Sequence, residues 1–488
     1  LRRLANRNTD LTEGPVGRRL FTLTLPMLVG MFSHVLFNLA DAYFVGRLGK
    51  AQLAAMGFTF PVVFFIHAIA MGVGIGTSAM VSRAVGAGDS TGVRRLTTHA
   101  IILAALIVLA VATVGILTMD PIFRLVGADD GTLRLVRQYM TVWYVGVLFV
   151  IVPMVGNNAL RGSGDTLYPG IVMVAGAGLN ILLDPLLIFG GEGLARMGLG
   201  PVLVLGLDRI PAMGLRGAAL ATVIARATTM LASLAILHWR KRMLDFSRPR
   251  LSELAASWKQ ILFIGIPAGG SMMLYPITAG VFTRVLSRFG TAAVAAFAPG
   301  DRIGSFVMLV IWATGTALVP FVGQNLGAGR VARVRRALRA ALTFGFLWGL
   351  AGYGVMLIAG RWIARRFTEE PDVVAALTLF LWIVPAEYAG RALSVLSNAS
   401  LNALHRPVTA AVLNAVRAAL LNVGMILLGA SLFGFHGAFA GLALSNLIAG
   451  GVSAFVLRMV SRRDLPSSAE EEDVHDAPYG SVTSASEA

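Results

Sequence analysis

Residues 45–58 read VGRLGKAQLAAMGF, and a related pattern returns at 286–299 as LSRFGTAAVAAFAP, at an offset of 241 residues. The same offset, without a gap, aligns VGAGDSTGVRR (85–95) with LGAGRVARVRR (326–336). A register that holds over so many positions indicates an internal duplication rather than a chance match. The sequence therefore predicts two structurally similar halves.

The composition places both halves in a membrane. Of the 488 residues, 56% are hydrophobic and 14% are charged, with a mean hydropathy of +0.75, whereas a soluble chain carries about 25% charged residues. Apolar stretches of about 20 residues mark transmembrane helices. Twelve are predicted, at 20–45, 53–81, 96–119, 139–160, 168–189, 214–238, 259–283, 292–322, 337–359, 374–396, 408–432 and 435–458.

The predicted fold is an all-α polytopic membrane protein with six transmembrane helices in each half. An even number of spans gives both halves the same orientation, so we expect a pseudo-two-fold axis along the membrane normal. The expected parts are a cytoplasmic segment 1–19, a lobe 20–238, a basic linker 239–258, a second lobe 259–460 and a disordered acidic tail 461–488. The tail is serine-rich and lacks apolar periodicity.

The net charge of +16 does not predict nucleic-acid binding. Arginine and lysine concentrate in the segments on one face of the predicted bundle, so the positive-inside rule places both termini in the cytoplasm. We expect a monomer in the lipid of the cytoplasmic (inner) membrane. With no cysteine and no metal-like histidine spacing, the chain predicts neither thiolate chemistry nor a metal centre or other cofactor.

Two carboxylates lie inside predicted spans of the first lobe. Asp41 belongs to FNLADAYFVGRLG (37–49) and Asp184 to NILLDPLLIFG (180–190). A charged side chain at membrane depth is costly and persists where it faces a wet cavity or has a partner. Asn180 precedes Asp184 by four residues, on the same helical face, and Tyr139 begins span four at the same depth. We expect these four side chains to form one polar layer near the outer face.

Each of these residues also has an ordinary structural interpretation. Asp41 can reach the interface and pair with Arg47, Tyr139 can be an interfacial belt residue, and Asn180 can bridge two helices. A second aspartate at matching depth favours the functional interpretation of Asp41.

Two further residues of span one are candidate cavity or hinge positions. Pro26 removes the backbone hydrogen bond to Thr22 and is expected to kink the span. His34 precedes Asp41 by two helical turns and is expected to face the same cavity.

The second lobe carries its own intramembrane charges. Glu387 and Arg391 stand four residues apart, a spacing that favours an ion pair along the helix, and Arg417 is a second candidate partner. Together with Asp301, they favour structural pairing over transport chemistry.

The motifs LADAYFVGRLG, LAAMGFTFP, GTSAMVSRAVGAGD, LRGSGDTLYP and NILLDPLLIFG, set on a six-plus-six chain, resemble the multidrug and toxic compound extrusion (MATE) family of cation-coupled antiporters. The resemblance covers about residues 15 to 460. It is strongest to the prokaryotic branch named for the DNA-damage-inducible F protein, which keeps a first-helix aspartate and an Asn-x-x-x-Asp pair on helix five.

The resemblance implies that Asp41, Asn180 and Asp184, with Tyr139 near them, bind the coupling ion. That ion is H⁺, or Na⁺ held by the first three residues, and it is exchanged for small organic cations. The sodium-coupled norfloxacin-exporter branch instead carries acidic residues on helices seven and ten. Here Tyr275 occupies the helix-seven place and Glu387 lies about one turn from the helix-ten place.

Two other classes of function remain as alternatives. A lipid-linked oligosaccharide flippase of similar architecture would need clustered cavity arginines, and the candidates are spread over both lobes: Arg226, Arg302, Arg391 and Arg417. A membrane-embedded enzyme would need a catalytic constellation. RGSGDT (161–166) contains the GxGD string of intramembrane aspartyl proteases, but Asp165 lies at the opposite face from the two N-terminal carboxylates. The sequence therefore predicts no enzyme.

Overall fold

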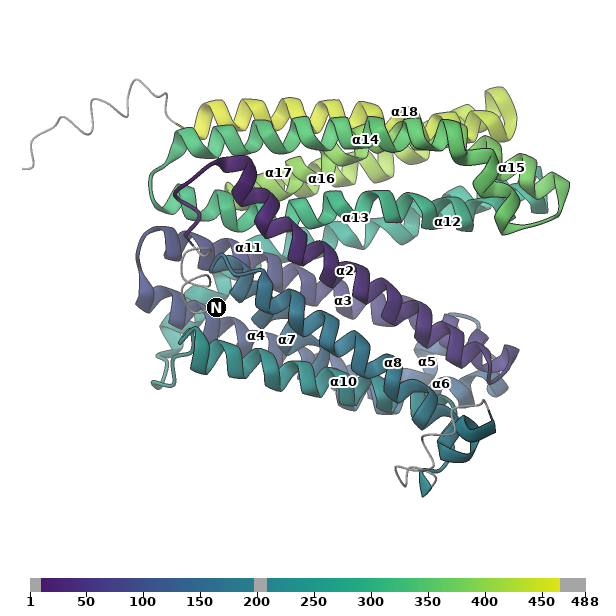
Figure 1. Ribbon diagram of the computed structural model, residues 1–488, viewed down its shortest axis with the longest axis horizontal. Helices are drawn as coiled ribbons and strands as arrows, with labels where there is room; N and C mark the ends of the chain where they lie inside the picture. Colours follow the sequence, from purple (N-terminus) through teal and green to yellow (C-terminus); the bar gives the residue numbers. More distant parts are fainter. Residues whose placement is uncertain (1–9, 197–208, 466–488) are drawn as a thin grey trace, which may run out of the picture.

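The computed structural model describes residues 10–196 and 209–465, and this part of the chain is helical without β-strands. In Figure 1 the first half, coloured purple to teal, and most of the second half, coloured green to yellow, form two adjacent groups of long helices. The helices of the first half are α2 (Val16–Gly46), α3 (Lys50–Gly86), α4 (Ser90–Leu117), α5 (Met119–Leu125), α6 (Asp130–Gly146), α7 (Leu148–Gly162), α8 (Leu167–Arg196), α10 (Leu215–Ala235) and the π-helical turn η2 (Ile236–Arg240).

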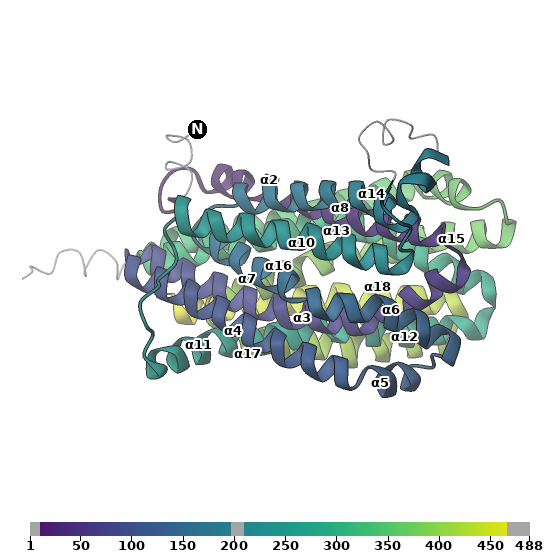
Figure 2. The same ribbon diagram turned by 90° about the horizontal axis from the view of Figure 1, so that it is seen from below.

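The second half repeats this arrangement, and Figure 2 shows that its long helices run along the same axis as those of the first. Its helices are α11 (Leu251–Met272), α12 (Leu274–Leu286), η3 (Ser287–Phe289), α13 (Thr291–Gly327), α14 (Val331–Phe367), α15 (Pro371–Ile383), η4 (Val384–Ala386), α16 (Glu387–Ala403), α17 (Pro407–Ala415), η5 (Val416–Asn422) and α18 (Val423–Asp464).

The described helices account for twelve membrane crossings. Ten helical segments are long and apolar enough to cross a membrane, and α6 with α7, bent by 45°, makes an eleventh. The segment Pro407–Asp464 has 58 residues, which as one straight helix would be about 87 Å long, far beyond a hydrocarbon core of about 30 Å. It reverses direction at Phe433 and Gly434, so it crosses twice. The predicted all-α fold with two six-helix lobes is confirmed.

Glycines allow this reversal. Gly434 has a φ of +62°, a conformation that favours glycine. On either side of the turn, Gly429 and Gly437 face each other so closely that a Cβ on either would lie 2.0 Å from the carbonyl oxygen of the other. The two crossings therefore pack backbone against backbone.

Aspartates cap the N-termini of two helices. The side chain of Asp89 accepts a hydrogen bond from Gly92 N at 2.7 Å at the start of α4, and that of Asp129 accepts one from Thr132 N at 2.7 Å at the start of α6. These oxygens satisfy amide groups that the first helical turn leaves without partners.

Helices begin and end outside the limits that hydropathy predicted. α11 begins at Leu251, inside the expected linker 239–258, because its first turns bury Leu254 and Ser257 against the bundle. Hydropathy registers only the stretch inside the hydrocarbon, whereas the helix continues wherever its backbone bonds and buried face are kept.

The chain ends show the same difference. α2 begins at Val16, within the expected segment 1–19, and α18 continues to Asp464, within the expected tail 461–488. Arg406 holds the end of α18 through two hydrogen bonds to Asp464, at 2.7 and 2.9 Å. Residues 1–9 and 466–488 lie outside the described residues, and the disorder of the tail stays a prediction.

The lobes touch mainly at one end of the molecule. A Cβ on Gly72 of α3 would lie 2.3 Å from the carbonyl oxygen of Gly265 on α11. Equally close pairs follow along α3: Gly76 with Ile261, Ser82 with Gly323, Arg83 with Gly327, and Gly86 with Gln324. Away from these contacts the lobes diverge toward α5 and α15 (Figure 1). We call the first the closed end and the second the open end.

The residues before α2 seal the closed end. Leu11 is fully buried; its N–H donates to Gln324 Oε1 at 3.3 Å, and its carbonyl accepts from Asn325 Nδ2 at 3.1 Å and from Arg333 Nη2 at 3.2 Å. Gln324 also donates through Nε2 to the carbonyl of Gly162 in the other lobe, at 3.1 Å. One side chain thus links the N-terminal segment and both lobes.

Candidate functional site

The two carboxylates of the first lobe come from neighbouring helices. α2 supplies Asp41 and α8 supplies Asp184, and both side chains are buried. The two helices approach closely at Gly30 and Gly170, where a Cβ on Gly30 would lie 3.4 Å from the Cα of Gly170. The packing brings the carboxylates close enough to interact electrostatically. Both predicted carboxylates therefore belong to one buried cluster, as their matching depth indicated.

Asn180 connects this cluster to a third helix. Its Nδ2 donates to Asp184 Oδ1 at 3.2 Å, one turn along α8, and contacts Thr222 Oγ1 of α10 at 3.5 Å. Asn180 is fully buried. Its contacts fit both interpretations, as a member of the polar cluster and as a bridge between α8 and α10.

Three buried oxygens of the cluster have no hydrogen-bond partner among the described residues: Asp41 Oδ1, Asn180 Oδ1 and Asp184 Oδ2. A buried acceptor without a donor is costly, and an ionised carboxylate without a partner is more so. A proton on a carboxylate removes that charge, and a hard cation such as Na⁺ is held by oxygen ligands. The donor set fits either ion.

Tyr139 and Arg226 complete the cluster. Tyr139, on α6, is buried and lies within electrostatic range of Asp41, Asp184 and Arg226. Arg226, on α10, lies with its Nη2 3.4 Å from His34 Nδ1. The site therefore combines two carboxylates with one guanidinium.

Arg226 also stacks on the first helix, with its guanidinium carbon 4.7 Å from the ring centre of Phe37. His34 is therefore connected to the cluster by its contact with Arg226, and it has no hydrogen bond to Asp41. Sequence reasoning considered Arg226 only for a flippase and did not single out Thr222. Their four-residue spacing, which puts both on one face of α10, was the available signal.

Pro26 lies on the side of α2 that faces α8. A Cβ on Gly170 would lie 2.7 Å from the Pro26 carbonyl oxygen, so the two helices cross tightly there. α2 is helical on both sides of Pro26, from Val16 to Gly46. The expected kink and hinge role stay predictions.

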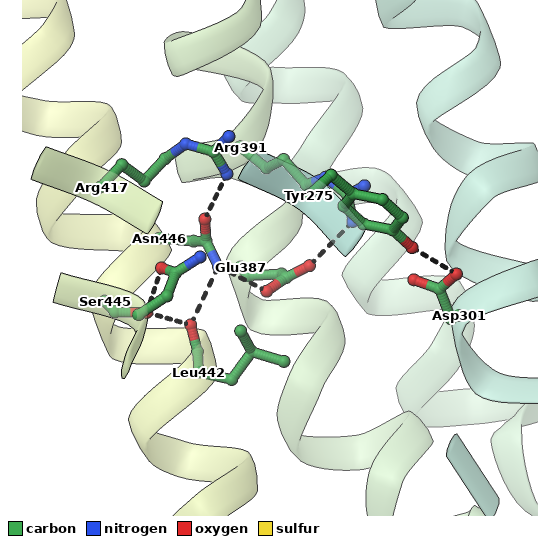
Figure 3. A network of polar contacts seen from close by, with 9 residues as sticks. Tyr275, Asp301, Glu387, Arg391, Arg417, Leu442, Ser445 and Asn446 are labelled. Atoms are coloured by element: carbon green, nitrogen blue, oxygen red, sulfur yellow. Dashed lines mark hydrogen bonds and ion pairs between the residues drawn. The ribbon is translucent and has the colours of Figure 1, made fainter. Parts of the chain in front are cut away.

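The charges of the second lobe form a network of direct contacts (Figure 3). Arg391 Nη1 lies 3.1 Å from Glu387 Oε1, and Asn446 Nδ2 donates to Glu387 Oε2 at 2.9 Å. Arg417 Nη1 donates to Asn446 Oδ1 at 3.2 Å. The predicted i, i+4 ion pair is present, and Arg417 reaches Glu387 through Asn446. Both oxygens of this buried carboxylate are satisfied.

Tyr275 belongs to the edge of the same network. Its hydroxyl donates to Asp301 Oδ2 at 2.8 Å (Figure 3), and its side chain is half exposed. Glu387 and Tyr275 therefore lie in the second lobe with partners of their own. Among the described residues, no group of three histidine, aspartate or glutamate side chains is arranged to hold a metal ion.

Comparison with known proteins gives one family. The family model MatE matches residues 26–186 and again residues 267–428. The two matches begin at Pro26 and Pro267, which the offset of the internal repeat also aligns.

Individual relatives agree over nearly the whole chain. A protein of Shewanella oneidensis named "FAD transporter" is 33% identical over 440 residues, which are 90% of this chain and 94% of the relative. The "Multidrug export protein MepA" of Staphylococcus haemolyticus is 24% identical, covering 92% and 95%. The crystal structure of the Vibrio cholerae MATE transporter VcmN in the bent form superposes with a TM-score of 0.84, at 30% identity over 92% of this chain and 98% of that one.

Proposed function

Because the chain belongs to the MATE family of membrane transporters, we propose that it is an antiporter that exports small organic cations in exchange for H⁺ or Na⁺. As a member of this family it is a transporter and not an enzyme, and its helices cross the membrane many times. The proposal concerns the direction, the coupling ion and the substrate, and it needs no further cofactor.

The observation that carries the proposal is the set of unpartnered oxygens in the first lobe. Asp41 and Asp184 each keep one buried oxygen without a donor among the described residues, whereas Glu387 of the second lobe has both oxygens paired. The carboxylate pair is a negative site that either the coupling ion or an organic cation can neutralise. The two ligands therefore compete for it. Loading the coupling ion then releases the organic cation. The carrier changes between its inward-open and outward-open states only when it holds one of the two.

The number of protons that the carboxylate pair exchanges in each cycle determines the driving force for transport. Exchange of one proton for one monovalent cation moves no net charge, so one unit of pH gradient supplies about 1.4 kcal/mol, roughly tenfold accumulation. A second proton per cycle would add about 2.3 kcal/mol for each 100 mV of membrane potential. Two carboxylates allow either stoichiometry.

We further propose that the protein lies in a bacterial-type inner membrane and that its closed end faces the cytoplasm. The basic segments around Arg94, Lys241 and Arg336 lie at this end, as the positive-inside rule requires. In that orientation the structure represents the outward-facing state, from which substrate leaves. The protein would act there as a monomer.

One observation supports a second candidate substrate. The Shewanella oneidensis relative is named "FAD transporter", and a dinucleotide carries a pyrophosphate that arginine recognises well. Arg226 in the first lobe and Arg417 in the second are partly buried arginines without a carboxylate in direct contact among the described residues. The oligosaccharide flippase gains less support, because Arg391 is paired with Glu387.

Uptake into proteoliposomes tests these proposals. A fluorescent organic cation and labelled FAD are supplied separately, under a pH gradient or a Na⁺ gradient, to the wild type and to Asp41→Asn. We expect gradient-driven uptake of the cation to fall at least tenfold in Asp41→Asn. Asp301→Asn, which removes a carboxylate of the second lobe, is the matched control and should keep most of the activity.

Each outcome has a defined meaning. The gradient that drives uptake identifies the coupling ion. Uptake of FAD alone would replace the organic-cation proposal with the dinucleotide one. Full activity of Asp41→Asn would overturn the role of the first lobe.

A further inference from the structure

A pocket of about 660 Å³ opens beside the second lobe, between the last turns of α14 and the start of α15. These parts of α14 and α15 lie at the open end of the second lobe (Figure 1). The rim of the pocket carries Arg361, Arg365 and Glu369, and its wall is an apolar face of α15. The transport mechanism assigns no role to this pocket.

The pocket lies at the depth of lipid headgroups. α14 has no charged residue from Ala340 to Gly360, a run of 21 residues that spans about 31 Å, the thickness of the hydrocarbon core. Arg361 follows directly, so it lies at the boundary between hydrocarbon and headgroups. Trp362 is 63% exposed and Trp382 is 41% exposed, as expected of aromatic residues in the interfacial belt.

The charged rim matches a headgroup with two opposite charges. Arg361 and Arg365 stand one turn apart on the same face of α14, and neither has a hydrogen bond or ion pair within residues 10–196 and 209–465. Arginine binds phosphate oxygens through paired N–H groups. Glu369 is likewise unpaired in this part of the chain. It would repel a purely anionic ligand, whereas it attracts an ammonium group beside the phosphate.

The wall of the pocket favours a lipid over a soluble ligand. Val374, Leu379 and Trp382 lie on the face of α15 that lines the pocket, and they lead from the charged rim toward the membrane interior. A free phosphate or phosphoamine has no group to cover this apolar surface. An acyl chain attached to the headgroup does.

We propose that this pocket binds a phospholipid of the outer leaflet with a phosphoethanolamine headgroup. The phosphate lies between Arg361 and Arg365, the ammonium group faces Glu369, and one acyl chain follows α15 past Trp382. The assignment to the outer leaflet rests on the proposed orientation of the closed end toward the cytoplasm.

Native mass spectrometry of the purified chain tests the proposal. The full-length protein in detergent is titrated with phosphatidylethanolamine, with phosphatidylglycerol and with soluble glycerophosphoethanolamine. We expect Arg361→Gln/Arg365→Gln to weaken retention of phosphatidylethanolamine at least tenfold. Glu369→Gln should lose the preference for phosphatidylethanolamine over phosphatidylglycerol.

Arg366→Gln is the matched control, because Arg366 lies on the same helix but faces Trp362, with its guanidinium carbon 5.4 Å from that ring, and does not line the pocket. It should retain the lipid as the wild type does. Equal retention in the double variant and the wild type overturns the proposal, as does an equal loss in Arg366→Gln. Binding of glycerophosphoethanolamine as tight as that of the lipid overturns the lipid assignment in favour of a soluble ligand. Transport activity enters none of these readouts.

Discussion

The two lobes satisfy their buried carboxylates differently. In the second lobe, Arg391 and Asn446 occupy both oxygens of Glu387. In the first, Asp184 accepts a hydrogen bond from Asn180, and its other oxygen has no donor among the described residues. A fully paired group holds a fixed charge, whereas a half-paired one can take up an ion. The difference supports the proposal that ion exchange belongs to the first lobe, while the pair in the second lobe is structural.

The donor to Asp184 gives a first prediction. We expect Asn180→Ala to lower gradient-driven uptake at least tenfold, because Asp184 then loses the amide that positions it. Thr222→Val removes only the longer contact at 3.5 Å and should cost less than threefold. Uptake rates at saturating substrate measure both. Equal effects of the two substitutions would contradict this ranking.

The ion pair of the second lobe gives a second prediction. Arg391→Gln leaves Glu387 buried without its cationic partner, and breaking a buried pair costs about 3–5 kcal/mol. We expect a marked fall in the thermal unfolding midpoint in detergent. Glu387→Gln/Arg391→Gln removes both charges and should recover most of the loss. A double variant no more stable than Arg391→Gln alone would show that the pair is not the cause.

Sequence alone identified the two carboxylates and the asparagine of the first-lobe cluster and missed other members. Asp41, Asn180 and Asp184 could be found because polar groups at membrane depth are rare and their depth follows from the span. The four-residue spacing of Thr222 and Arg226 puts both on one face of span six. The sequence does not determine whether that face turns toward span five, so their place in the cluster could not be assigned.

At the level of helices, the closed end depends on backbone contact. Small residues let membrane helices approach closely, and α3 uses this along its second half, where Gly72 meets Gly265 and Gly86 meets Gln324. The same helix also carries Gly57, where an added methyl group would have no neighbouring atom within 4 Å. One helix therefore supplies both a sensitive and an insensitive glycine.

We expect Gly72→Ala to lower transport at least fivefold. Its methyl group would lie 2.3 Å from the Gly265 carbonyl oxygen, and such overpacking costs about 1–3 kcal/mol, so the lobes cannot close fully there. Gly57→Ala should behave as the wild type. Uptake rates measure both, and normal uptake by Gly72→Ala would refute a tight seam.

Hydropathy located all twelve crossings but not the ends of the helices. The apolar run shows which residues lie in the hydrocarbon, so the crossings formed by α14 and α18 were found. The polar ends of these helices extend into water, where side-chain contacts such as that between Arg406 and Asp464 stabilise them. The surface helix α5 (Met119–Leu125) was missed, because seven residues are too few for a periodic pattern.

At the level of the whole molecule, the duplication explains the architecture but not its asymmetry. The repeat predicted two lobes, and the matching segments begin at Pro26 and Pro267. It did not predict that Leu11, which precedes the first lobe, is buried against α13 and α14 of the second. A contact between segments more than 300 residues apart leaves no periodic signal.

This seal gives the prediction for the whole transporter. Leu11→Ala should loosen the closed end and populate the state open there, because its side chain fills a buried cluster. The chain has no cysteine, so one introduced at Ala79, which is buried at the seam, reports opening through its rate of maleimide labelling. We expect that rate to rise at least threefold.

Thr12→Ala is the control for this experiment, since the Thr12 hydroxyl bonds only to Asp10 within the segment. It should leave the labelling rate unchanged. A rate that is unaffected by Leu11→Ala would show that the seal does not restrain the lobes.

The position of Leu11 also affects how the protein is made. Leu11 leaves the ribosome 313 residues before Gln324, its hydrogen-bond partner, a delay of roughly 15 to 60 seconds at ordinary translation rates. During that interval the first six helices can insert while the segment ahead of them has nowhere to dock. The seal at the closed end therefore forms only after the second lobe has been synthesised, so a truncated nascent chain cannot adopt the sealed state.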